Sequence, residues 1–173
     1  SDDLGNSWLE ITLNEERITK MKVINSILYY TSDSGFHKLD NGKKTLLEGF
    51  TWGFLVFPKD DIMYVTKYNP TKNITEFYVS KDFGLTFTLK NNGWWNPLKG
   101  KAATSSVYDS GVKIASAESN PNIVYATILG EEDDDIDDKN FIGIYKSTNA
   151  GETWVNLNPT GETGGPYSSQ NPC

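Results

Sequence analysis

The densest group of residues able to do chemistry is a run of carboxylates between positions 131 and 138. Carboxylate oxygens bind Ca²⁺, but a twelve-residue calcium loop starting at Asp133 needs Gly at its sixth position and Glu at its twelfth. This sequence has Asp138 and Ile144 there. Blocks of like charge are usually solvated loops. We expect a solvated loop, with a looser calcium site at Asp133, Asp135 and Asp137 as the alternative. The run comprises Glu131, Glu132, Asp133, Asp134, Asp135, Asp137 and Asp138.

Trp94 and Trp95 stand side by side in a segment rich in Gly, Asn and Pro, between positions 91 and 97. Their large ring faces are suited to stacking on sugar rings. Alternatively, one ring packs between neighbouring sheets and the other covers the linker. Both interpretations stay open, and Trp94 and Trp95 are the candidate ligand-binding residues.

The chain offers few groups for acid–base or nucleophilic catalysis. His37 is its one histidine, and its place in a strand-like stretch beside Lys38 predicts an exposed side chain rather than a general base. Asp60, Asp61 and Asp109 fall near predicted turns, where Asp commonly hydrogen-bonds the backbone. No carboxylate pair can be singled out as acid and base, so we assign no catalytic residue and no cofactor other than the calcium alternative.

The elements that must position these residues are set by a short pattern that occurs four times. It consists of a hydroxyl residue, an Asp or Asn two positions on, a Gly two further, then a polar residue and an aromatic one. The fourth copy is worn, with Lys38 and Thr45 in the hydroxyl and aromatic places. The copies are Ser1, Asp3, Gly5, Ser7 and Trp8; Ser80, Asp82, Gly84, Thr86 and Phe87; Ser147, Asn149, Gly151, Thr153 and Trp154; and the worn Asp40 and Gly42.

Each copy joins two strand-like runs, so it predicts a hairpin turn. The Asp or Asn side chain accepts hydrogen bonds from backbone N–H groups just ahead of it and pins the turn. The Gly permits a left-handed backbone, and the hydroxyls satisfy remaining turn groups. The closing aromatic residue starts the next strand as an apolar anchor.

This pattern resembles the Asp-box, or BNR repeat, of sialidase-like, xyloglucanase-like and sortilin-like β-propellers, over nearly the whole chain. In those families the Asp-box joins the third and fourth strands of a blade at the outer rim, which implies a structural role for these residues. The resemblance also implies an extracellular or cell-surface location.

The same resemblance bears on activity. Sialidases of this fold hold a carboxylate substrate with three arginines, and this chain has one, Arg17; a complete sialidase site is therefore excluded, because Lys does not replace a bidentate Arg. Xyloglucanase-like hydrolases use two distant aspartates, as inverting glycosidases do. Sortilin-like ectodomains continue into a cysteine-rich module, which this sequence does not show.

The strand pattern predicts an all-β chain of β-propeller blades with four antiparallel strands. Apolar and polar residues alternate through short runs punctuated by turn residues. We expect blades at about 18–48, 51–90 and 112–158, preceded by the last strand of another blade at 1–13, so that 1–159 is a partial propeller. The second strands echo one another as Leu28-Tyr29-Tyr30, Met63-Tyr64-Val65 and Val124-Tyr125-Ala126.

Three blades and a strand leave sheet edges uncovered, which natural proteins avoid, and propellers close with four to eight blades. We therefore expect a larger propeller, whose remaining blades come from the same polypeptide or another chain. The Gly/Ser/Pro-rich segment 160–173 is expected to be a tail or the lead into a further repeat.

Composition excludes some partners. The chain has 23 acidic residues against 16 Lys and Arg, a formal net charge of −7 over 173 residues. Such a charge disfavours nucleic acid and anionic membranes. No apolar run approaches the ~20 residues that span a bilayer. The one cysteine, Cys173, cannot form a disulfide within the chain, so it leaves the redox compartment undetermined.

These observations favour a non-catalytic, secreted or cell-surface scaffold that recognises a carbohydrate or a protein. The first alternative is a segment of a xyloglucanase-like glycoside hydrolase whose catalytic carboxylates lie partly outside this chain. The second alternative is a fragment of a sortilin-like receptor.

Overall fold

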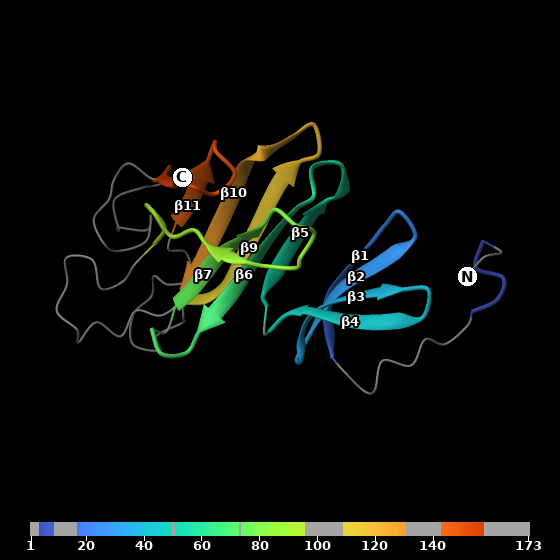
Figure 1. The fold of residues 1–173 in the computed structure, drawn as a ribbon. Coiled ribbons are helices and arrows are strands. Elements are labelled where there is room, and N and C mark those ends of the chain that lie inside the picture. The colour runs from blue at the N-terminus through green and yellow to red at the C-terminus, as the bar shows by residue number, and fades with distance from the viewer. Residues whose placement is uncertain are drawn as a thin grey trace, which may run out of the picture.

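The computed structural model describes residues 4–8, 17–49, 51–72, 74–95, 109–130 and 143–157. This part of the chain forms three antiparallel sheets of four strands each (Figure 1), so the prediction of an all-β fold is confirmed. The first sheet contains β1 (Ile18–Ile24), β2 (Ile27–Ser32), β3 (Gly35–Asp40) and β4 (Lys43–Glu48). The middle sheet contains β5 (Gly53–Phe57), β6 (Ile62–Asn69), β7 (Ile74–Ser80) and β8 (Thr88–Leu89), with the short 3-10 helix η1 (Pro58–Asp60) between β5 and β6. The last sheet contains β9 (Asp109–Ala117), β10 (Asn120–Gly130), β11 (Gly143–Ser147) and β12 (Val155–Asn156).

Strand order within each sheet follows the chain, so each sheet is a simple up-and-down meander. Because neighbouring strands are antiparallel, the turns after the first and third strands lie at one end of the sheet. The hairpin after the second strand lies at the other end. Three such sheets in succession are compatible with propeller blades.

The middle sheet is covered on one face by the first sheet and on the other by the last sheet. Side chains of successive strand residues point to opposite faces, so neighbouring residues enter different cores. In β6, Met63 and Val65 pack with Tyr29 and Phe36 of the first sheet. Tyr64, between them, packs with residues of the last sheet. The near-continuous apolar run of β6 follows from this double burial.

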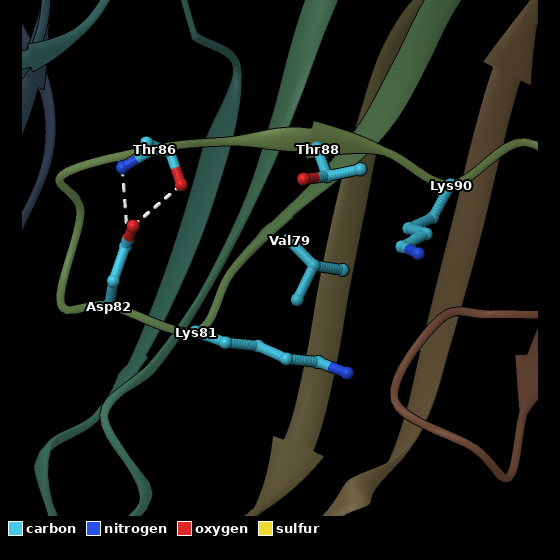
Figure 2. Close-up of a pocket in the computed structure, with 6 residues that line it drawn as sticks. All are labelled: Val79, Lys81, Asp82, Thr86, Thr88 and Lys90. Atoms are coloured by element: carbon cyan, nitrogen blue, oxygen red, sulfur yellow. Dashed lines mark hydrogen bonds between the residues drawn. The ribbon is translucent and has the colours of Figure 1, made fainter.

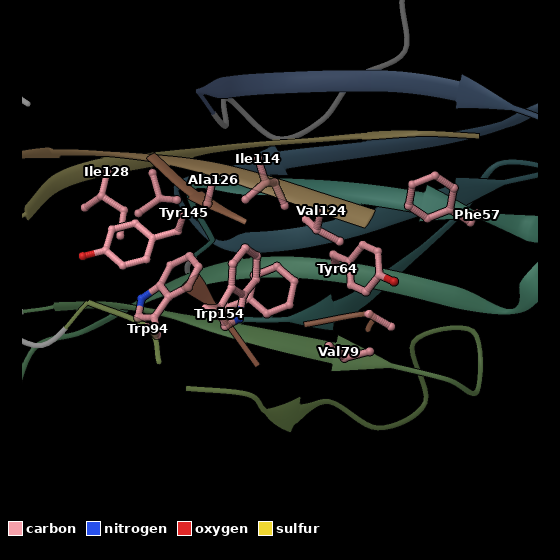
Figure 3. Close-up of a cluster of buried hydrophobic side chains, with 13 residues drawn as sticks. Phe57, Tyr64, Val79, Trp94, Ile114, Val124, Ala126, Ile128, Tyr145 and Trp154 are labelled. Carbon is pink, nitrogen blue, oxygen red and sulfur yellow. The ribbon is translucent and has the colours of Figure 1, made fainter. Parts of the chain in front are cut away.

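The larger core lies between the middle and last sheets and is rich in aromatic rings (Figure 3). Trp154 stands edge-on to Phe77 and to Trp94, with ring centroids 4.7 Å apart in both pairs. Edge-to-face pairs add about 0.5–1.5 kcal/mol beyond the apolar area they bury. These three rings come from the last sheet, the middle sheet and the linker that follows β8.

Several expectations fall on residues outside the described ranges. They are Ser1 and Asp3 of the first turn, the strand through Leu9–Leu13, the carboxylate run at 131–138, and the segment 160–173.

The backbone at Gly151 supplies a test of this packing. Its φ is +83°, and a Cβ built there would overlap the ring of Phe77. Gly42 has a similar φ of +76° but no atom within 4 Å of a built Cβ. Gly42→Ala therefore measures backbone strain alone, about 1–2 kcal/mol.

We expect Gly151→Ala to lower the free energy of unfolding by at least ~2 kcal/mol more than Gly42→Ala, because the Phe77 ring must move. Urea unfolding of both variants measures the difference. Equal losses would mean that the Phe77 contact is not as tight as described.

Candidate functional site

The Ser80 turn is held by a closed set of hydrogen bonds. The Ser80 hydroxyl donates to Asp82 Oδ1 (2.7 Å) and accepts from the buried backbone N–H of Gly84 (2.7 Å). Asp82 also accepts two hydrogen bonds from Thr86, one from its backbone N–H at 2.9 Å and one from its hydroxyl at 2.6 Å (Figure 2). The carboxylate is thus committed to its own turn.

The Ser147 turn repeats this arrangement with an amide in place of the carboxylate. Ser147 donates to Asn149 Oδ1 (2.9 Å) and accepts from the N–H of Gly151 (2.8 Å). Asn149 accepts from the Thr153 N–H and donates from Nδ2 to the Thr153 hydroxyl, both at 2.9 Å. The direction of the Thr hydrogen bond therefore reverses between the two turns.

The other two copies share the backbone conformation of these turns, and the worn copy has a different side-chain hydrogen bond. In all four copies the Gly and the residue before it have positive φ, as Leu4 (58°) and Gly5 (90°) do in the first. Asn41 and Gly42 connect β3 to β4 directly, with Asn41 Nδ2 donating to Asp40 Oδ1 at 2.9 Å. Near the first copy, Trp8 is exposed, unlike the buried Trp154.

The two complete turns differ in their expected response to acid. The Thr86 hydroxyl, helped by the Thr86 N–H and Ser80, lowers the pKa of Asp82 from 3.8 to about 2. A depressed folded-state pKa contributes stability that is fully present above 3.8 and is lost as pH falls towards 2.

We expect Asp82→Asn to keep the turn, as Asn149 does, and to reduce the loss of stability between pH 4 and pH 2. Urea unfolding midpoints across that range measure the effect, with Asp60→Asn as the control on an exposed carboxylate. If Asp82→Asn loses as much stability between pH 4 and pH 2 as the unaltered protein, Asp82 is not the source of that loss.

A shallow pocket of about 180 Å³ opens beside the Ser80 turn (Figure 2). It has an apolar wall from Val79 and offers hydroxyl and ammonium groups. This volume is below the ~300–1,000 Å³ of most small-molecule sites, so the pocket fits one ring or one side chain of a ligand. Its lining residues are Val79, Lys81, Asp82, Thr86, Thr88 and Lys90.

Glu152 of the last sheet ties this pocket to the Ser147 turn. Its carboxylate pairs with Lys90 Nζ at 2.7 Å and with Lys81 Nζ at 3.4 Å. The Lys90 hydrogen bond is the main cause of the lowered pKa of Glu152. Two lysines of the pocket lining are therefore paired with a carboxylate of the last sheet.

The two candidate tryptophans have different environments. Trp94 is buried, and its Nε1 donates to the Thr75 carbonyl at 2.7 Å. Its ring faces contact Phe77, Tyr145 and Trp154. Trp95 is only partly buried against this core. Of the two, Trp95 alone leaves ring surface for a ligand.

Sequence reasoning missed a polar cluster around one buried carboxylate, Glu76, at the β6–β7 hairpin. Glu76 is almost fully buried. It accepts hydrogen bonds from Lys72 Nζ (2.7 Å), the Tyr78 hydroxyl (2.9 Å), Asn69 Nδ2 (3.1 Å) and Asn91 Nδ2 (3.3 Å). The alternation in β7, which puts Glu76 on the same face as Tyr78, was the available signal.

The protonation states of this cluster oppose acid or nucleophilic catalysis. Burial alone would raise the pKa of Glu76, but hydrogen bonds from Lys72, Asn69 and Tyr78 and the Lys72 charge lower it overall. Burial, then the Glu76 hydrogen bond, raises the pKa of Tyr78 to about 12. A general acid needs a pKa near neutrality and a phenolate nucleophile needs a lowered one. The cluster therefore anchors the hairpin to the linker at Asn91.

We expect Glu76→Gln to lower the free energy of unfolding by about 1–3 kcal/mol, because charge-assisted hydrogen bonds are lost around a buried group. Tyr78→Phe removes one of those bonds and should cost less, about 0.5–1.5 kcal/mol. Chemical denaturation of the two variants checks this order, and a larger loss in Tyr78→Phe would contradict it.

The prediction that His37 is exposed is wrong. His37 is buried in β3, its ring stacks on Tyr30 with centroids 5.0 Å apart, and its Nε2 lies 2.9 Å from the Ser34 hydroxyl. Tyr30 is its ladder partner in β2, a neighbour that the local sequence does not reveal. The Ser34–His37 pair has the spacing of a nucleophile and its base. The pocket beside the Ser80 turn does not include this pair, because its lining residues belong to the middle sheet.

Asp133, Asp135 and Asp137 lie outside the described residues, so the calcium alternative stays a prediction. Within the described ranges, no group of three or more His, Cys, Asp or Glu side chains is placed to hold a metal ion. The same ranges contain no helix with the length and apolar character needed to cross a membrane.

Comparisons of the chain with models of known protein families and with curated protein sequences give no match. The fold by itself defines the class, which is an all-β protein of stacked four-stranded meanders.

Proposed function

We propose that this chain is a non-catalytic β-propeller scaffold that recognises a carbohydrate or a protein outside the cell or at its surface. The observation that carries the proposal is the polar pocket of the middle sheet, two of whose lysines pair with Glu152 of the last sheet. Its Lys81, Thr86 and Thr88 groups supply hydrogen-bond donors and acceptors. Hydroxyl-rich ligands and polar side chains are recognised by such groups.

The use of the carboxylates supports binding over catalysis. Asp82 and Glu76 accept hydrogen bonds within their own hairpins, and Glu152 pairs with two lysines. Inverting hydrolysis needs two carboxyl groups that face each other across a substrate, one of them with a raised pKa. The pKa values of Asp82, Glu76 and Glu152 are all lowered.

The turn pattern and the stacking of the sheets support the propeller. Two turns share one hydrogen-bond set, and each leads into the closing strand of its sheet. The extracellular location depends on the Asp-box resemblance.

Binding to an array of neutral and acidic glycans tests whether the protein recognises a carbohydrate. Titration with the glycan that binds most strongly gives the affinity. We expect Lys81→Ala and Trp95→Ala each to weaken that binding roughly tenfold, in the range of interface contacts, with Lys59→Ala as an exposed control. Loss of binding in Lys59→Ala as well would remove the pocket from the interaction.

Turnover is measured on the same material. Release of reducing ends from a β-glucan would overturn the non-catalytic assignment in favour of the hydrolase alternative. Glycan binding without release of reducing ends supports the proposal. If no glycan binds, the carbohydrate arm is wrong and the protein arm alone stands.

A further inference from the structure

The chain contains two Asn-Gly pairs, Asn41-Gly42 and Asn92-Gly93. In such a pair the backbone nitrogen of the Gly can attack the side-chain amide carbon of the Asn, because the Gly has no Cβ to hinder the approach. The attack requires the peptide group between the two residues to rotate towards the Asn side chain. Asn41 and Asn92 are both exposed, so burial does not separate the two pairs.

The Asn41-Gly42 pair forms the tip of the β3–β4 hairpin. Asp40 and Lys43 are partners across the ladder, so the loop between them has two residues. Both residues have positive φ, 47° at Asn41 and 76° at Gly42, which fits the two-residue turn that favours Asn-Gly. A Cβ built on Gly42 would meet no atom within 4 Å, so no packing opposes rotation of the tip. Asn41 Nδ2 donates to Asp40 Oδ1 at 2.9 Å, an exposed hydrogen bond that water readily replaces.

The Asn92-Gly93 pair is fixed against the last sheet. The Asn92 carbonyl accepts a hydrogen bond from the Trp154 N–H at 2.8 Å. The Gly93 backbone lies so close to the backbone of Trp154 that no Cβ fits there. Rotation of the peptide group between Asn92 and Gly93 therefore requires these contacts to open first, and local opening of a packed segment costs free energy.

We propose that Asn41 is a site of spontaneous deamidation and that the fold protects Asn92 from the same reaction. The Gly42 nitrogen forms a bond to Asn41 Cγ, and its proton leaves with the side-chain nitrogen as ammonia. The five-membered imide that results takes up one water molecule. Breaking one of its two ring C–N bonds gives aspartate, and breaking the other gives iso-aspartate. The reaction needs no oxidant, reductant or cofactor.

Both products disturb the hairpin. Aspartate puts a carboxylate where the Asn41 amide now donates to Asp40, so like-charge repulsion replaces a hydrogen bond. Iso-aspartate adds one carbon to the backbone of the two-residue loop, and loop length sets the register of a hairpin. Beyond the turn, β4 packs Leu47 in the smaller core and pairs Glu48 with Lys67 of the middle sheet. The modification therefore acts on the strand that joins the first two sheets.

This inference does not rest on the proposed ligand recognition. The protein is aged in warm, mildly alkaline buffer and digested with trypsin, and the peptides 39–43 and 91–99 are quantified by mass spectrometry. Fragmentation assigns the mass increase from NH₂ to OH to a single Asn, and a freshly purified sample sets the background. We expect Asn41 to be converted at least roughly tenfold faster than Asn92, because only Asn92 must wait for local opening.

The matched control is the same chain unfolded in guanidinium chloride, where both Asn-Gly pairs are free of tertiary contacts and should be converted at similar rates. Three outcomes overturn the proposal. Asn41 stays intact in the folded protein over a time that converts it in the unfolded chain. Asn92 is converted as fast as Asn41 in the folded protein. The rate difference persists in guanidinium chloride, which assigns it to the local sequence rather than to the fold.

Asn41→Asp tests the consequence for the hairpin, because it reproduces the aspartate product. Asn25→Asp is its control: Asn25 is exposed, has a positive φ of 49° in the two-residue β1–β2 turn, and follows Ile24 rather than a carboxylate. We expect Asn41→Asp to lower the guanidinium midpoint more than Asn25→Asp does. Adding Asp40→Asn should restore most of the loss. Equal midpoints for Asn41→Asp and Asn25→Asp overturn the repulsion with Asp40.

Discussion

The junction around Trp154 is the contact on which the arrangement of the middle and last sheets depends. Its Nε1 donates to the Lys90 carbonyl at 3.2 Å, and its backbone N–H donates to the Asn92 carbonyl at 2.8 Å. Gly93 lies so close to the Trp154 backbone that no Cβ fits there. The closing residue of one turn therefore fixes the linker of the preceding sheet, and that linker carries Trp94 into the core. Turn, linker and core are one structural unit.

Charged groups serve this unit by holding segments that strand ladders do not reach. Glu152 connects the Ser147 turn to Lys81 and Lys90, and Glu48 connects the first sheet to Lys67 at 2.9 Å. Glu76 joins its hairpin to Asn91 at the start of the linker. The pKa values of Glu152 and Glu76 are lowered by their hydrogen bonds, so both carboxylates stay ionised at neutral pH. These carboxylates are therefore committed to contacts within the protein.

The sequence predicts the fold class because local signals are strong. Alternation at Met21 and Val23, the apolar run of β6, and Gly after Asp or Asn in the turns all act through near neighbours in the chain. What the sequence does not predict depends on residues brought together by folding. His37 is buried because Tyr30 stacks on it across the ladder. The hydrogen bonds of Glu76 need two strands and a linker, and Trp94 is separated from Trp95 in environment only when the linker meets the last sheet.

The edge-on packing of Trp94 and Trp154 also makes the joint between the sheets visible to spectroscopy. Two indoles with centroids 4.7 Å apart and planes at 74° couple their electronic transitions, whereas Trp8 is exposed to water. Near-ultraviolet circular dichroism and the blue edge of the fluorescence spectrum therefore report on that joint, and the red edge reports on the exposed Trp8 and Trp52. The protein thus carries an intrinsic optical gauge of whether its middle and last sheets are in contact.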